Sequence, residues 1–292
     1  MSDAALIPPS APSYRLAAPC KLNLFLHITG RRADGYHNLQ TLFQMLDVGD
    51  ELQFTPRNDG VITLRCNDPS LETDDNLVLR AARLLKAQAP ATAGIDIFLD
   101  KQTPMGGGLG GGSSDAATTL HALNRLWQLR LTTDELAKLG LTLGADVPVF
   151  VHGVTAFAEG VGEHLQAVEL PKTWYLVVTP KVHVSTAAVF THADLIRDSK
   201  PLTLDTLLNS DWRNDCQPLV ERLYPEVAIT LQWLVKYAPS RMTGTGASVF
   251  ASFQDESSAR RALADLPPQY RGFVAEGVNQ SPMWIGLEQL PA

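Results

Sequence analysis

Apolar and polar residues alternate along residues 20–28, CKLNLFLHI, which is the pattern of a β-strand. One face would carry Cys20, Leu22, Leu24, Leu26 and Ile28, and the other would carry Lys21, Asn23, Phe25 and His27. Polar residues on a strand usually face water, and less often they line a cleft. Asn23 could be a structural amide or could bind Lys21 or a substrate, whereas His27 is expected to make an ordinary polar contact.

The segment after the Asp34-Gly35 turn signal predicts several strands in succession, LQTLFQML and then DELQF after a second Gly-Asp. Apolar positions at helical spacing predict an amphipathic helix over 76–87, a helix carrying Ala116, Leu120, Leu123 and Trp127, and another from Thr133 to about Leu143. Ile95, Ile97 and Leu99 alternate with residues that include Asp96 and Asp100, which predicts a strand between the first two helices.

A second unit is predicted to begin after the loop at 159–162, with a strand at 174–180. A glycine-rich turn in RMTGTGASVFASF enters a further strand, and ESSARRALADL has the pattern of a helix. Strands and helices mixed without a strict alternation predict an α+β fold. We place the two predicted domains at residues 1–165 and 166–292.

Composition narrows the functional classes. A chain of 292 residues with 45% hydrophobic residues can bury a sizeable core, and 24 basic against 31 acidic residues give a formal charge of −7. This charge disfavours binding to nucleic acid or to an anionic membrane. Three scattered cysteines, a proline-rich lead MSDAALIPPSAPS without signal-peptide character, and no long apolar run predict a cytoplasmic protein.

Six of the seven residues from Gly106 to Gly112 are glycine, in the stretch PMGGGLGGGSSDAA. A flexible linker is disfavoured because the stretch joins a predicted strand directly to a predicted helix. A Walker A loop requires a lysine after its last glycine, where this chain has Ser113 and Ser114. A dinucleotide fingerprint is matched only formally, because the acids about 20 residues on lie at a helix start. Glycine amides and a helix N-terminus favour an anion site, at which the two serines could cap the helix or contact phosphate and metal.

These residues resemble the second motif of the GHMP kinases. APCKLN at 18–23 is similar to the first motif of that superfamily and MTGTGASVF at 242–250 to the third, so the resemblance spans the chain. It implies a two-domain α+β fold with the active site in the cleft between the domains. The third-motif residues Gly244, Thr245, Gly246 and Ala247 are expected to be structural first, with Thr245 a possible supporting contact.

The resemblance implies ATP as phosphoryl donor, with Mg²⁺ accompanying the nucleotide. The residues expected to wrap the phosphates of ATP are Pro104, Met105, Gly106, Gly107, Gly108, Leu109, Gly110, Gly111, Gly112, Ser113 and Ser114, and those toward the adenosine are Asn76, Leu77 and Lys101. The catalytic pair would be Lys21 and Asp146, with Asp146 accepting the proton of the substrate hydroxyl and Lys21 holding it ionised. From its neighbours alone, Gly144 and Pro148, Asp146 is more simply a cap or turn residue.

KLNLFLHITGRRADGYHNLQTLFQ and LTLGADVPVFVHG resemble one branch of these kinases, whose small-molecule substrate is a cytidine diphosphate derivative of methylerythritol. In that branch the acceptor is the 2-hydroxyl. The substrate would be bound by Asn23, Tyr36, His37, Thr186 and Phe190, with His37 reading the base edge and the two aromatic rings flanking the base. The branch commonly has proline where this chain has Ala187. A homoserine or mevalonate kinase, and a non-catalytic nucleotide-binding protein, remain the alternatives.

Overall fold

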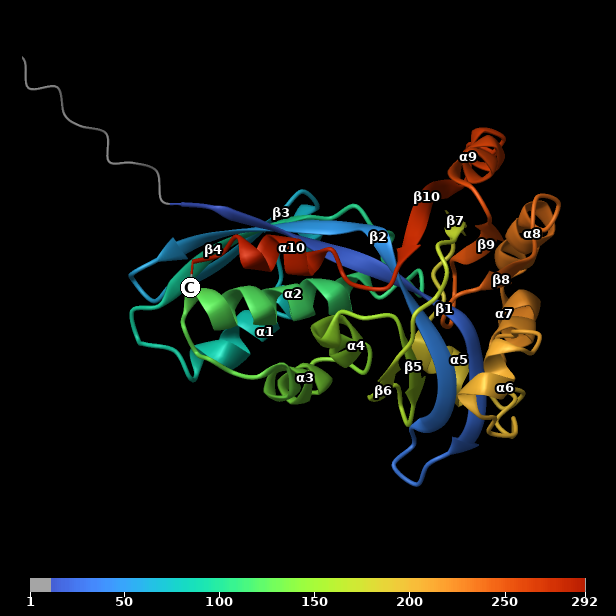
Figure 1. Ribbon diagram of the computed structural model, residues 1–292, viewed down its shortest axis with the longest axis horizontal. Helices are drawn as coiled ribbons and strands as arrows, with labels where there is room; N and C mark the ends of the chain where they lie inside the picture. The colour runs from blue at the N-terminus through green and yellow to red at the C-terminus, as the bar shows by residue number, and fades with distance from the viewer. Residues whose placement is uncertain (1–11, 292) are drawn as a thin grey trace, which may run out of the picture.

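Two long antiparallel strands connect the parts of the molecule. A computed structural model describes residues 12–291, so the predicted features of residues 1–11 lie outside the described residues. Strand β1 (Tyr14–Arg31) pairs along its length with β2 (His37–Arg57), and Figure 1 shows this pair running between the left and right parts of the molecule. The sheet order is β3-β4-β2-β10-β7-β9-β8, with β1 and β5 also paired to β2 and with β6 paired to β5. The prediction of an α+β fold is confirmed.

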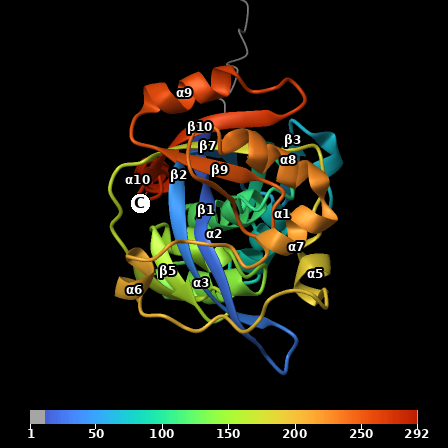
Figure 2. The same ribbon diagram turned by 90° about the vertical axis from the view of Figure 1, so that its right-hand side faces the viewer.

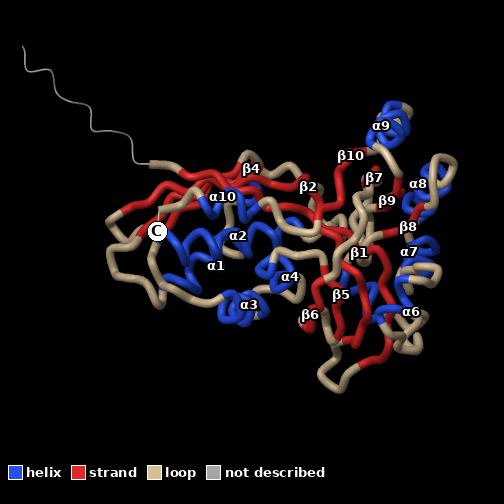
Figure 3. Tube along the Cα trace, in the orientation of Figure 1, coloured by secondary structure: helices blue, strands red, loops and turns tan. Residues whose placement is uncertain are grey.

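In the first half of the chain, helices pack against one face of the sheet (Figure 3). Its remaining elements are β3 (Ile62–Cys66), η1 (Pro69–Leu71), α1 (Leu77–Lys86), β4 (Gly94–Asp100), α2 (Gly111–Leu126), α3 (Thr133–Leu141), α4 (Val147–His152), β5 (Ala156–Glu159) and β6 (His164–Ala167). Figure 3 shows α1 and α2 beside strands β1, β2 and β4, with α3 and α4 farther from the sheet. The glycine-rich stretch enters α2 at Gly111, between a strand and a helix as predicted.

The second half adds a smaller sheet with helices on its outer side. Its elements are β7 (Trp174–Thr179), α5 (Thr186–Thr191), α6 (Leu204–Leu208), α7 (Gln217–Leu223), α8 (Pro225–Leu234), β8 (Ser240–Met242), β9 (Val249–Phe253), α9 (Glu256–Ala264), β10 (Arg271–Val278) and α10 (Met283–Glu288). In Figure 2 the helices α7 and α8 lie toward the viewer beside β9, and α9 lies at the top, next to β10. No helix in residues 12–291 is long and apolar enough to cross a membrane.

Hydrophobic packing joins the two halves. One buried cluster lies between the first sheet and α1, α2 and α10, and a second lies within the smaller sheet and its helices. A third cluster takes residues from both halves, among them Leu22 of β1, Leu109 of the glycine stretch and Phe250 of β9. The division of the chain at residue 165 stays a prediction, and the C-terminal residues Met283 and Leu287 pack in the first cluster.

Two sequence expectations about β1 and β2 are wrong. The Gly49-Asp50 pair does not separate two strands, because β2 continues through it and Gly49 lies against Pro19 of β1. The polar face of β1 does not meet water, since Lys21, Asn23 and His27 are each at most 3% exposed. Register shifts after Pro19 and Asn23 break the simple alternation, and Leu24 and Phe25 pack in the same cluster.

His27 also differs from its prediction. Among the described residues neither of its ring nitrogens has a hydrogen-bond partner. Its ring lies 5.2 Å from that of Phe25, and burial, followed by the charge of Arg213, lowers its pKa. The side chain is therefore a neutral packing group rather than a satisfied polar contact.

We expect Gly49→Ala to destabilise the fold, because its Cβ would lie 2.0 Å from the carbonyl oxygen of Ala18 and 2.4 Å from Cα of Pro19. Overpacking of this kind costs about 1–3 kcal/mol or more of the free energy of unfolding, which urea denaturation measures. Gly30→Ala is the matched control in β1, because a Cβ there meets nothing within 4 Å. It should leave stability unchanged or raise it by up to about 1 kcal/mol, and a comparable loss in the two variants would contradict the close approach at Gly49.

Candidate active site

A cavity of about 660 Å³ opens where β1, the β1–β2 turn, the glycine stretch, α4 and α5 meet. Nine of the predicted site residues line it: Lys21, Asn23, Tyr36, His37, Gly108, Ser113, Asp146, Thr186 and Phe190. Gly244 and Thr245 of the third motif also line it, as does Ala187. The fold therefore brings residues from five separate regions of the chain to one concave site, which is the usual form of a small-molecule site.

Lys21 places a buried ammonium in the wall of this cavity. Its Nζ donates to Oδ1 of Asn23 at 2.7 Å and to the carbonyl oxygen of Gly108 at 2.9 Å, and it lies 3.3 Å from Oδ2 of Asp146. The side chain of Lys21 is 3% exposed and that of Asp146 38%, so the carboxylate is the open partner of the pair. Asn23 also donates to Oγ1 of Thr41 at 2.9 Å, which orients its amide toward Lys21.

Asp146 occupies the N-cap position of α4, but its side chain makes no capping hydrogen bond. Its carboxylate instead approaches the ammonium of Lys21. Pro148 in the first turn of α4 has no N–H to be capped, which suits this arrangement. Asp146 is therefore a turn residue at a helix start, as its neighbours predict, but its side chain does not act as the cap.

The glycine stretch is an ordered loop held by the third motif. The main-chain nitrogens of Ala247 and Ser248 donate to the carbonyl oxygens of Gly106 and Gly107, at 3.4 and 3.2 Å. Gly108 adopts a φ of 73°, and a Cβ there would lie 2.4 Å from the carbonyl oxygen of Thr243. These contacts support the expected structural role of the third motif and explain why only glycine fits at 108.

The two serines begin α2 without capping it. Gly110 is at the N-cap position, and no side chain caps the helix. The buried Oγ of Ser114 has no hydrogen-bond partner among the described residues, whereas Ser113 faces the cavity. Free hydroxyls at the N-terminus of a 16-residue helix suit an anion, because the helix dipole and unpaired N–H groups already favour negative charge there.

The residues predicted toward the adenosine lie on the other side of the start of α2 and do not line the cavity. Asn76 caps α1, since its Oδ1 accepts from the nitrogen of Val78 at 2.9 Å, and Leu77 is the first residue of that helix. A Cβ on Gly112 would lie 3.7 Å from Cδ1 of Leu77, and one on Gly111 would lie 3.0 Å from Nζ of Lys101. The side chains of Leu77 and Lys101 therefore adjoin the last glycines of the loop, whereas that of Asn76 is engaged by the start of α1.

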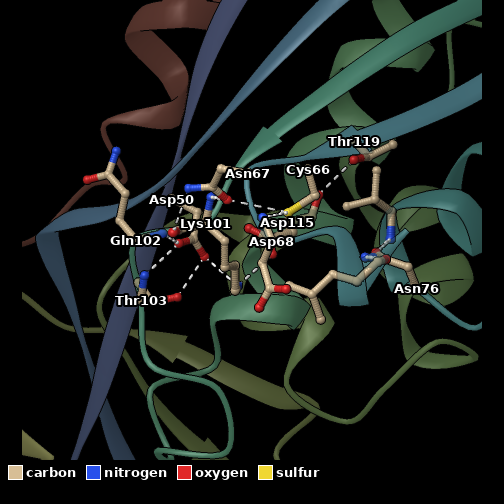
Figure 4. Close-up of polar contacts among 12 residues, drawn as sticks. Asp50, Cys66, Asn67, Asp68, Asn76, Lys101, Gln102, Thr103, Asp115 and Thr119 are labelled. Atoms are coloured by element: carbon tan, nitrogen blue, oxygen red, sulfur yellow. Dashed lines mark hydrogen bonds and ion pairs between the residues drawn. The ribbon is translucent and has the colours of Figure 1, made fainter. Parts of the chain in front are cut away.

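Lys101 belongs to a buried charged network that sequence reasoning missed. Figure 4 shows its Nζ between two carboxylates, with distances of 2.6 Å to Asp50 and 2.8 Å to Asp115. Asp50 also accepts from the main-chain nitrogens of Gln102 and Thr103 and from the hydroxyl of Thr103. In the sequence Asp50 belongs to a Gly-Asp turn signal, and no local pattern relates it to Lys101 or Thr103, more than fifty residues later.

The two carboxylates are supported unequally. Asp50 accepts four hydrogen bonds, whereas Oδ1 of Asp115 has no partner among the described residues. Burial raises the pKa of Asp115 to about 7 against the opposing charge of Lys101, and the two carboxylates raise the pKa of Lys101 despite its burial. We conclude that Lys101 is charged and that Asp50 is its principal partner.

The aromatic end of the cavity is formed by Tyr36, His37 and Phe190. Tyr36 is 61% exposed at the β1–β2 turn, and the ring of His37 lies 5.2 Å from that of Phe190 in α5. The hydroxyl of Thr186 pairs with that of Thr245 at 2.9 Å, which connects α5 to the third motif. Among residues 12–291, no group of three or more His, Cys, Asp or Glu side chains is arranged to hold a metal ion.

A glycine loop at a helix N-terminus, next to a Lys–Asp pair in a cavity, defines a phosphotransferase site. Residues 76–154 match the GHMP kinases N terminal domain, and residues 193–271 match the GHMP kinases C terminal domain. The chain belongs to the GHMP kinase family, and its ATP-dependent phosphotransferase class follows from that membership.

Close relatives define the branch of the family. A 4-diphosphocytidyl-2-C-methyl-D-erythritol kinase of Shewanella woodyi is 58% identical over 94% of this chain and 96% of its own, and one of Mannheimia succiniciproducens is 56% identical over 95% and 92%. A crystal structure of 4-(cytidine 5'-diphospho)-2C-methyl-D-erythritol kinase, 33% identical, superposes with a TM-score of 0.80 and covers 90% of this chain and 99% of its own. The Methanococcus jannaschii mevalonate kinase, at 17% identity and a TM-score of 0.67 over 93% of this chain and 100% of its own, shares the fold.

We expect Asp50→Asn to cost more stability than Asp115→Asn. Removing one partner of a buried ion pair costs about 3–5 kcal/mol, and Asp50 also accepts three further hydrogen bonds. Asp115→Asn leaves Lys101 paired with Asp50, so its cost should be less than about half as large. Urea unfolding of both variants at neutral pH measures the difference, and equal losses would contradict the assignment of Asp50 as principal partner.

The raised pKa of Asp115 predicts that the stability of the protein depends on pH. Folding raises the pKa of Asp115 from 3.8 to about 7. The protonated carboxyl is therefore favoured in the folded state, and its contribution to the free energy of unfolding is fully present below pH 3.8 and is lost as the pH rises through about 7. The free energy of unfolding of the wild type should therefore fall relative to that of Asp115→Asn as the pH is raised across this interval. A constant difference across this interval would show that Asp115 is already ionised throughout.

Proposed function

We propose that this protein transfers the γ-phosphoryl group of ATP to the 2-hydroxyl of 4-diphosphocytidyl-2-C-methyl-D-erythritol, giving the 2-phosphate and ADP. This reaction would serve the methylerythritol phosphate route to isoprenoid precursors. The relatives described above are named as kinases of this substrate, and each aligns with nearly the whole of this chain. The structural observation that best supports phosphoryl transfer is the Lys21–Asp146 pair, which lines a cavity beside the glycine loop.

In the proposed reaction Asp146 is the general base. Its carboxylate accepts the proton of the 2-hydroxyl, the hydroxyl oxygen forms a bond to the γ-phosphorus, and the bond from that phosphorus to the β–γ bridging oxygen breaks to release ADP. Lys21 orients Asp146 and contributes a positive charge that is already in position before the reaction begins. The half-open position of Asp146 supports its contact with a substrate.

The glycine loop is proposed to bind the phosphates of ATP, with Ser113 and Ser114 beside them. The unpartnered hydroxyl of Ser114 and the N-terminus of α2 support this role. Asn76, Leu77 and Lys101 are proposed to lie toward the adenosine. Because Nζ of Lys101 is engaged by Asp50 and Asp115, its contact with the nucleotide would come from its main chain or its aliphatic stem.

Mg²⁺ is proposed to accompany ATP, where it neutralises charge on the phosphate oxygens. Hard oxygen donors are the ligands that Mg²⁺ prefers, and it usually needs only one or two from the protein when phosphates are present. The hydroxyl of Ser113, which lines the cavity, and that of Ser114, without a partner among the described residues, fit this requirement. We propose these two side chains as the protein groups nearest to the ion.

The aromatic end of the cavity is proposed to bind the cytosine base. Tyr36 and Phe190 would flank the ring, His37 would read its edge, and Asn23 and Thr186 would contact the rest of the substrate. Ala187 lines the same end of the cavity. A cytoplasmic location is proposed as well, supported by the three cysteines, which are free and buried.

The direct test is incubation of the purified protein with ATP, Mg²⁺ and the cytidyl substrate, followed by phosphorus NMR. We expect one new phosphomonoester signal and stoichiometric ADP. Mevalonate and homoserine serve as the alternative acceptors in the same assay. Phosphorylation of either of these in preference to the cytidyl substrate would overturn the proposed specificity.

Asp146→Asn and Lys21→Ala should each lower turnover by at least about 10²-fold, because a positioned base contributes about 10²–10⁴-fold. Lys172→Ala and Glu276→Gln are matched controls, since these residues form an exposed Lys–carboxylate pair with a Nζ–Oε2 distance of 2.6 Å. Circular dichroism and urea unfolding establish that each variant is folded. Near-normal turnover in a folded Asp146→Asn enzyme would remove Asp146 from the proposed mechanism.

A further inference from the structure

Arg197 makes an unusual set of contacts behind the aromatic end of the cavity. Among the described residues its guanidinium has no carboxylate partner. It donates from Nε to Nε2 of His37 at 3.0 Å. Its other donors bind main-chain carbonyl oxygens, at 3.0 Å for Phe190, 2.6 Å for His192, 3.0 Å for Leu195 and 3.5 Å for Ala193.

These contacts hold both walls of the aromatic end. The carbonyl oxygens of Phe190 and His192 lie at the C-terminal end of α5, where a helix leaves its last carbonyls without intrahelical partners. Arg197 satisfies them and thereby fixes the turn that follows Phe190. The same guanidinium contacts His37, whose ring lies 5.2 Å from that of Phe190. One side chain therefore positions the histidine and the aromatic ring together.

The bond to His37 also determines where the imidazole proton lies. An arginine side chain has donors and no acceptor, so Nε2 of His37 must be the acceptor of this hydrogen bond. In a neutral imidazole the proton is then on Nδ1. Burial, followed by the charges of Arg197 and Arg31, lowers the pKa of His37 and keeps the ring neutral.

The Nδ1–H group is available to a ligand. No described residue accepts a hydrogen bond from it, and His37 lines the cavity. With Nε2 occupied by Arg197, this side chain can only donate to whatever binds there. Cytosine offers two acceptors on one edge, O2 and N3, so a fixed donor matches that edge.

We propose that Arg197 is a specificity-determining positioning residue, which locks His37 as the Nδ1–H tautomer so that the imidazole donates a hydrogen bond to the acceptor edge of the substrate base. The identity of the base rests on the function proposed above, whereas the tautomer and its cause do not. Arg197 touches no reacting atom, and its effect on the substrate passes through His37 and Phe190.

The tautomer is measured on the full-length protein labelled with ¹⁵N-histidine, by two-bond ¹H–¹⁵N correlation at neutral pH. The His37 signals are assigned by their loss in His37→Gln. We expect a protonated Nδ1 and an unprotonated Nε2 in the wild type, and Nε2–H in a substantial fraction of Arg197→Met. A wild-type His37 protonated on Nε2 would overturn the proposal whether or not the Arg197 variant folds and whether or not the cytidyl compound is the substrate.

Steady-state kinetics supply the second measurement. Arg197→Met should raise KM for the cytidyl substrate at least about tenfold, since a well-aligned hydrogen bond to a buried group is worth about that factor. Turnover should stay within about twofold and KM for ATP should not change, because no group at the reacting centre is altered. Arg222→Gln is the matched control, because Arg222 is exposed and does not contact His37. Its partner Asp194 belongs to the same segment as Arg197. A folded Arg197→Met enzyme with wild-type KM and tautomer would contradict the proposal.

Discussion

The pairing of β1 with β2 is the constraint on which the site depends. Because β1 pairs with no other strand in residues 12–291, its second edge has main-chain N–H groups that need acceptors. The nitrogen of Lys21 donates to the carbonyl oxygen of Leu109 at 3.0 Å, and that of Asn23 donates to Oγ1 of Thr243 at 2.9 Å. The nitrogen of Ile28 donates to Oδ2 of Asp215 at 2.8 Å. The glycine loop, the third motif and the segment before α7 are therefore all attached along one strand edge.

Two buried ammonium groups lie against different parts of the glycine loop. Lys21 binds the carbonyl oxygen of Gly108, and Lys101 lies beneath Gly111 between Asp50 and Asp115. A buried charge is tolerated only where acceptors satisfy it, so each ammonium restricts the positions that the loop can adopt. The loop itself contains no lysine, and the ammonium that contacts Gly108 comes from β1.

Much of the architecture could be predicted from local pattern. The helices at 77–86 and 111–126, the strand at 94–100 and the mixed α+β class agree with the predictions, because apolar periodicity reports which face of an element is buried. The continuous β2 could not be predicted, since Gly49-Asp50 has the composition of a turn. Gly49 is instead required by close contact with Pro19, and local composition carries no information about such a contact.

The motifs identified Lys21, Asp146 and the glycine stretch as candidate residues, and their residue types limited the chemistry to anion binding and proton transfer. Their distances, the burial of Lys21 and the half-open position of Asp146 arise from contacts between segments more than eighty residues apart. The same holds for Asp50, whose carboxylate binds Lys101, and for the contact of Arg197 with His37, which lies 160 residues earlier in the sequence. A sequence pattern records which groups are available, whereas long-range packing sets the geometry and charge environment in which they act.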